Sequence, residues 1–147
     1  MGRIAWGRLL IGGIAAGFVF NAFEFVLHGR ILGGAWRAAM LSLGKTPEEM
    51  AAGQSTSMPL LILWAFLVGI LGVWVYAAGR PRLGPGPKTA VVAALVTWFA
   101  VTFLGAMESV AFDLYPRGLV VAWVAGELVG IVVSILIGAW LYREASS

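Results

Sequence analysis

The sequence predicts an all-α integral membrane protein: a bundle of four membrane-spanning helices with a short amphipathic segment in the first outer loop. Composition is the first observation behind this fold class. The chain of 147 residues is 61% hydrophobic and only 12% charged, whereas an ordinary soluble domain is roughly 45–50% apolar and about 25% charged. Its mean hydropathy is +0.93, which excludes a water-soluble monomer. Twenty glycines and seven tryptophans are typical of close helix packing and interfacial anchoring in a bilayer.

The second observation is that four apolar stretches each come close to the roughly 20 residues that a helix needs to cross the hydrocarbon core. Because a lone helix satisfies its own backbone hydrogen bonds in lipid, we expect helices rather than strands. The expected spans, within one transmembrane domain covering residues 1–147, are residues 4–27, 58–78, 89–110 and 119–141. No small-x-small cleavage site precedes the polar residues of the first span, so we expect it to stay uncleaved.

The first outer loop is long enough to carry structure of its own. Its apolar residues recur at helical spacing, which predicts a short amphipathic helix on the membrane surface; they are Leu32, Trp36, Ala39, Met40 and Leu43. The run from Thr46 to Glu49 then predicts a helix start, with Thr46 as N-cap, Pro47 at the first helical position and Glu49 three residues after the cap. The alternative is a plain surface loop with one capped turn.

The distribution of Lys and Arg predicts the orientation. Six lie at the termini and in the second loop, against four in the other two loops, which favours both termini inside and placement in the cytoplasmic (inner) membrane. The six are Arg3, Arg8, Arg80, Arg82, Lys88 and Arg143, and the four are Arg30, Arg37, Lys45 and Arg117. A formal net charge of +3 is too small and too scattered for a nucleic-acid partner. The lack of cysteine excludes disulfides, thiolate metal sites and thiol nucleophiles.

Small residues form stripes at helical spacing in three spans. Such stripes allow helix backbones to approach closely in lipid. The stripes are Gly13, Gly17 and Asn21; Ala94, Thr97, Val101, Gly105 and Glu108; and Gly126, Gly130, Ser134 and Gly138. The sequence leaves open whether they meet within one chain or between chains. Besides the lipid bilayer, we therefore expect a homo-oligomer or a membrane partner subunit.

The few ionisable groups inside the spans gather toward one side of the membrane. Such groups usually face the bundle interior or a water-filled cavity. Asn21, Glu24 and His28 share one face of the first span, Glu108 extends the stripe of the third, and Glu127 lies within the fourth. With a rise of about 1.5 Å per residue, all three glutamates lie toward the outer ends of their helices. We expect an outward-facing pocket formed by these five residues.

Close carboxylates repel, so such a pocket needs a bound cation, a proton or His28 as imidazolium. Glu24 and His28, four residues apart, could both reach one metal ion, which makes a divalent cation the candidate cofactor. The leading hypothesis is binding or conduction of a cation, a proton or a small cationic ligand. One alternative is an accessory or oligomer-forming subunit with a purely structural polar network. The other is a membrane enzyme acting on a lipophilic substrate, although no catalytic pair is recognisable and no catalytic residue is assigned.

Two segments after the first span also carry a family resemblance. Residues 32–36 read Leu-Gly-Gly-Ala-Trp and residues 43–50 read Leu-Gly-Lys-Thr-Pro-Glu-Glu-Met, and the chain ends its last span with Gly138-Ala139-Trp140. With these motifs the chain resembles a bacterial family of short four-span membrane proteins, the domain of unknown function 1761. The resemblance implies the four-span fold, and it assigns no activity and no functional residue.

Overall fold

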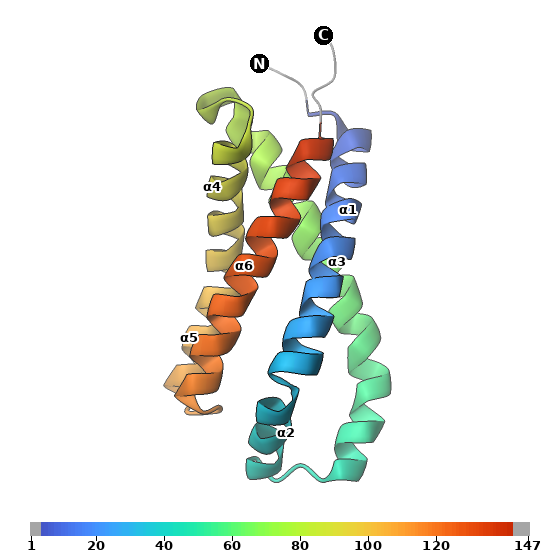
Figure 1. Cartoon of the computed structure of the whole chain (residues 1–147), viewed down its shortest axis with the longest axis vertical. Helices are drawn as coiled ribbons and strands as arrows, with labels where there is room; N and C mark the ends of the chain where they lie inside the picture. The colour runs from blue at the N-terminus through green and yellow to red at the C-terminus, as the bar shows by residue number, and fades with distance from the viewer. Residues whose placement is uncertain (1–3, 143–147) are drawn as a thin grey trace.

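The computed structural model describes residues 4–142 and confirms an all-α bundle (Figure 1). Its helical elements, in chain order, are α1 (Trp6–Glu24), the π-helical segment η1 (Phe25–Ile31), α2 (Gly33–Ser42), α3 (Pro47–Leu83), α4 (Pro87–Trp98), the π-helical segment η2 (Phe99–Phe103), α5 (Leu104–Ala111) and α6 (Arg117–Leu141). In length and composition, four continuous helical stretches can cross a membrane: Trp6–Ile31, Pro47–Leu83, Pro87–Ala111 and Arg117–Leu141. These contain the predicted spans almost entirely.

The connectivity brings the beginning of α1 and the end of α6 to the same end of the bundle (Figure 1). We call the opposite end, which carries α2 and the first residues of α3, the α2 end. An even number of spans is what the predicted orientation requires. Arg3 and Arg143, which entered the Lys and Arg comparison, lie outside the described residues.

The segment between the first two spans contains the predicted short helix and the predicted helix start. The expected amphipathic helix is α2, with Ala39 fully buried and Trp36 partly buried. The capping box is present, because the Glu49 backbone N–H donates to Thr46 Oγ1 at 3.2 Å and the Thr46 N–H donates to Glu49 Oε2 at 2.8 Å. With Pro47 at its first position, α3 begins well before the predicted span at residue 58.

Glycines bring α1 into backbone contact with both α3 and α6. A Cβ added to Gly12 would lie 2.5 Å from the carbonyl oxygen of Gly138, and one added to Gly69 would lie 2.5 Å from the nitrogen of Gly17. No L side chain fits such distances without moving backbone. The glycine stripes of the first and fourth spans therefore pack helices of the same chain.

The third span departs from the predicted face because η2 inserts an extra residue into the helical repeat. Buried positions run through Ala94 and Thr97, and the next one is Thr102, a step of five residues. The buried face then continues through Ala106 and Ser109. The α-helical count placed Gly105 and Glu108 on this face, and that expectation is wrong, since both are exposed.

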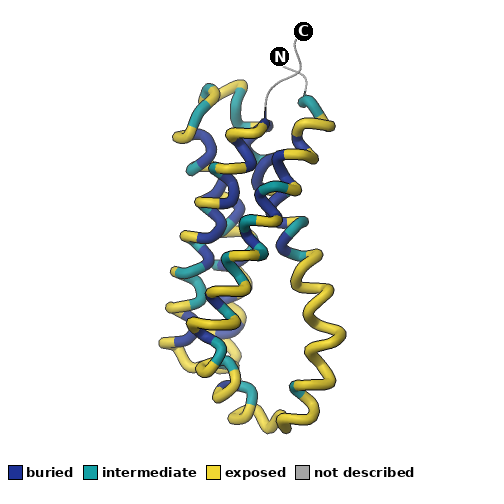
Figure 2. Tube along the Cα trace, turned by 45° about the vertical axis from the view of Figure 1, so that its right-hand side comes forward, coloured by how far each residue is buried: buried dark blue, intermediate teal, exposed yellow. Residues whose placement is uncertain are grey.

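The first half of α3 stands away from the rest of the bundle. Residues 51–63 are all exposed, and in Figure 2 this stretch runs separately from the other helices, whereas the second half of α3 is packed. Pro59 lies inside this stretch and lacks the N–H that would bond to the carbonyl four residues earlier. The divergence opens a space between α3 and the first span near the α2 end.

Candidate functional site

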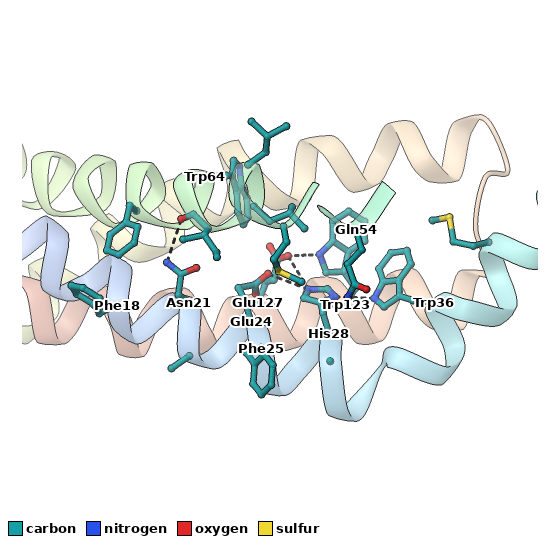
Figure 3. A pocket seen from close by; sticks show the side chains of 18 residues that line it. Phe18, Asn21, Glu24, Phe25, His28, Trp36, Gln54, Trp64, Trp123 and Glu127 are labelled. Carbon is teal, nitrogen blue, oxygen red and sulfur yellow. Dashed lines mark hydrogen bonds and ion pairs between the residues drawn. The ribbon is translucent and has the colours of Figure 1, made fainter. Parts of the chain in front are cut away.

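Three of the five predicted site residues converge from two spans. One ligand atom from each of Glu24, His28 and Glu127 lies within 4.8 Å of the others. The Nε2 atom of His28 lies 3.3 Å from Glu24 Oε2 and 3.5 Å from Glu127 Oε1, so the imidazole bridges the two carboxyl groups (Figure 3). Glu24 and His28 come from consecutive elements, α1 and η1, and Glu127 comes from α6. We call these residues the Glu24–His28–Glu127 cluster.

Glu127 is the buried centre of this cluster, with only 2% of its surface exposed. Its Oε1 accepts a hydrogen bond from the indole N–H of Trp123, one turn earlier on α6, and its Oε2 accepts from the Thr102 hydroxyl at 2.5 Å. An indole N–H can only donate. His28 faces Oε1 as well, so polar side chains from three elements (η1, η2 and α6) surround this carboxyl group.

His28 is held in one tautomer by α2. The indole N–H of Trp36 donates to His28 Nδ1 at 2.8 Å, so this nitrogen carries a lone pair and the ring proton lies on Nε2. A flipped imidazole ring would place a carbon atom where Nδ1 meets Trp36 and another where Nε2 meets the two carboxyl groups. The Trp36 ring also packs edge-on against Trp123 and Tyr115, with centroid distances of 5.7 and 5.1 Å. The amphipathic helix thus aims the single N–H of a neutral imidazole at two carboxyl groups.

Glu24 is the member of the cluster that lacks a full set of partners. Its Oε2 faces His28, whereas its Oε1 is buried and has no hydrogen-bond partner among the described residues. Burying a polar atom without a partner costs free energy. Glu24 is also the acid that borders open space, with a fifth of its side chain exposed.

That open space is a cavity of about 1420 Å³ between the first span and α3, which we call the α1–α3 cavity (Figure 3). Its lining is mostly apolar and rich in aromatic rings. Among the described residues that line it, Glu24 and Glu127 are the only acids, His28 is the only other titratable group, and no Lys or Arg is present. The described lining therefore offers two carboxyl groups and no Lys or Arg to balance their charge.

The other two predicted residues take different places. Asn21 lines the cavity, and its side-chain amide donates to Gly17 O at 2.9 Å and to Ile62 O at 3.3 Å, which ties α1 to α3. Glu108 is exposed on α5, beyond η2, and does not belong to the metal-type group found among the described residues. Two of the three glutamates meet, and Glu108 lies apart from them.

The cluster has the residue types of a metal site, but the Trp36 contact opposes metal ligation by His28. A ligating histidine normally donates its second ring N–H to an acceptor. Here the second nitrogen faces a donor, so a metal on Nε2 would force a proton onto Nδ1 and break that hydrogen bond. The arrangement suits a proton or an organic cation, which needs only carboxylate oxygens, better than a divalent metal ion.

Three partners of the cluster were not predicted. Trp123 lies four residues before Glu127 on one helical face, so the sequence contained the signal. Trp36 was expected on the amphipathic helix, but its pairing with His28 depends on how α2 folds back. Thr102 is brought to Glu127 only by the register shift of η2.

The chain was also compared with known proteins. No protein-family model, no curated protein and no solved structure matches it.

Proposed function

We propose that this membrane protein binds a cation or a proton at the Glu24–His28–Glu127 cluster, from the α1–α3 cavity. The observation that carries the proposal is that two carboxyl groups converge on one imidazole with no Lys or Arg in the described cavity lining. With His28 neutral, two ionised carboxylates leave two negative charges; with His28 as imidazolium, one charge remains and the Trp36 hydrogen bond is lost. Uncompensated charge in a low-dielectric interior is costly, and a bound cation or proton removes that cost.

Binding is supported better than conduction through a continuous path. The residues lining the α1–α3 cavity end at Phe18 and Phe66, and beyond them α1 contacts α3 and α6 through glycines. Passage to the other end of the bundle would require these helices to separate. We therefore propose a binding site that opens toward one end, which the Lys and Arg distribution predicts to be the outer one.

The competing hypothesis of an accessory subunit rested on the glycine stripes. Those of the first and fourth spans are used within the chain, because Gly17 lies against Gly69 of α3 and Gly138 lies against Gly12 of α1. A partner subunit or a homo-oligomer would have to use other surfaces. This observation favours the binding hypothesis over the accessory one.

The test is a stability screen against cations in wild type, Glu24→Gln and Glu127→Gln. A ligand that binds only the folded state raises its stability with concentration, so we expect wild type to be stabilised by at least one of methylammonium, alkali, Mg²⁺ or Zn²⁺ ions or by lower pH. Both variants should lose that response. The matched control is Glu108→Gln, an exposed glutamate outside the cluster, which should respond as wild type does. Equal responses in all four proteins would overturn the proposal.

A further inference from the structure

The α1–α3 cavity is far larger than the cation site on its wall. Its volume is about 1420 Å³, whereas one water molecule occupies roughly 30 Å³ of liquid and pockets for small organic ligands measure about 300–1,000 Å³. A proton or a hydrated metal ion would leave nearly all of this space unused. The cavity therefore has room for a ligand with a body as well as a charge.

The lining indicates what kind of body this is. Aromatic rings surround the cluster on both sides along the cavity (Figure 3); they belong to Phe18, Phe25, Trp36, Trp64, Phe66 and Trp123. The exposed stretch of α3 adds Leu60, Leu61 and Ile62. Aliphatic and aromatic ligand groups are favoured against such surfaces, and tryptophan faces attract a cation within about 6 Å.

The charge of the occupant follows from the acids. Glu24 Oε1 is a buried acceptor without a donor, and a protonated amine supplies N–H donors and positive charge at once. A zwitterionic phospholipid fits poorly, because its phosphate lies only a few bonds from its ammonium group and would meet two carboxylates. No Lys or Arg in the described lining would offset that phosphate.

We infer that the α1–α3 cavity binds an amphipathic organic amine in its protonated form, with the ammonium group at Glu24 and the apolar body along the aromatic lining. This inference rests on the cation site proposed above and adds the chemical class of its ligand. Residues 51–63 of α3 are exposed and carry most of one cavity wall. A ligand dissolved in the bilayer therefore reaches the cavity sideways, between α1 and α3.

The test uses three probes on the full-length protein in phosphatidylcholine nanodiscs. Decylammonium has both the charge and the apolar chain, methylammonium has the charge alone, and decanol has the chain alone. Binding is measured by calorimetry and by tryptophan fluorescence, at equal bilayer mole fractions for the two decyl compounds. We expect saturable binding of decylammonium, none of decanol, and at least tenfold weaker binding of methylammonium.

Variants then locate the site. Charge-assisted hydrogen bonds contribute enough that Glu24→Gln should weaken decylammonium binding roughly tenfold to a hundredfold, whereas Glu108→Gln should leave it unchanged. Trp64→Phe should reduce the fluorescence change, and Trp74→Phe, outside the cavity lining, should keep it. Binding of decanol as tight as that of decylammonium, or no saturable decylammonium binding, would overturn the inference. If methylammonium binds as well as decylammonium and depends on Glu24, the cation site stands and the amphipathic ligand is refuted.

Discussion

Replacing the buried carboxylate of Glu127 in two ways separates its charge from its hydrogen bonds. Glu127→Ala removes the acceptor of the Trp123 indole N–H and of the buried Thr102 hydroxyl, and it leaves a void among buried side chains. Each unsatisfied buried donor costs about 1–3 kcal/mol. Two such donors and the void predict a loss of about 3–5 kcal/mol in the free energy of unfolding, the range for breaking a buried charged pair.

Glu127→Gln keeps those contacts. Its amide oxygen can accept from Trp123 and His28, and its NH₂ group can donate to the Thr102 hydroxyl, which is able to accept. Only the ionisable group is lost, and its negative charge is uncompensated when neither a cation nor a proton is bound. In cation-free buffer, we therefore expect the free energy of unfolding of Glu127→Gln to be within about 1 kcal/mol of the wild-type value, or higher than it.

The assay is reversible unfolding in mixed detergent micelles, followed by circular dichroism, with the pH and the cation concentration held fixed. Glu108→Gln serves as the control for removing a glutamate charge at an exposed position. If Glu127→Gln loses as much stability as Glu127→Ala, the charge itself holds the fold. The argument from excess negative charge would then be refuted.

Three further predictions address packing, the tautomer and linkage. Gly12→Ala should destabilise the bundle by about 1–3 kcal/mol, because its Cβ would meet the Gly138 carbonyl. In the same unfolding assay, the control Gly7→Ala should be neutral or stabilising, because Gly7 has open space around it. The chain has one histidine, so ¹⁵N NMR of histidine-labelled protein should report the Nε2–H tautomer of His28 in wild type. An Nδ1–H signal in wild type would contradict the assignment. The variant Trp36→Phe should weaken the preference for this tautomer. Because proton and cation compete for the same carboxylates, cation affinity should rise with pH, by up to about tenfold per pH unit where one proton is exchanged per cation, and an affinity independent of pH would mean that no proton is displaced.

Most of the fold follows from local sequence patterns. Apolar length locates the four spans, and the run from Thr46 to Glu49 fixes the start of α3 through its own hydrogen bonds. Glycine spacing predicts the close contacts of α1, because only backbone geometry is involved. The partner of each stripe could not be assigned, since a stripe carries no information about which helix it meets.

The candidate site could be predicted in part. Glu24 and His28 lie four residues apart on one continuous helical stretch, and Glu127 lies deepest in its span of the three glutamates. Spacing and depth therefore predict these three residues. Glu108 was misplaced because an α-helical count cannot detect the additional residue of η2. The α1–α3 cavity depends on the divergence of residues 51–63, an arrangement between helices that composition and periodicity do not encode.

The most direct test of the cation site is infrared difference spectroscopy of the carboxyl groups when decylammonium or another bound cation is added. If the cation replaces a proton held by the cluster, the carbonyl band of a protonated carboxylic acid should decrease and the carboxylate bands should increase. Glu24→Gln should abolish this change, and Glu108→Gln should preserve it. A spectrum without any carboxyl change, or the same change in Glu24→Gln, would contradict cation binding at the Glu24–His28–Glu127 cluster.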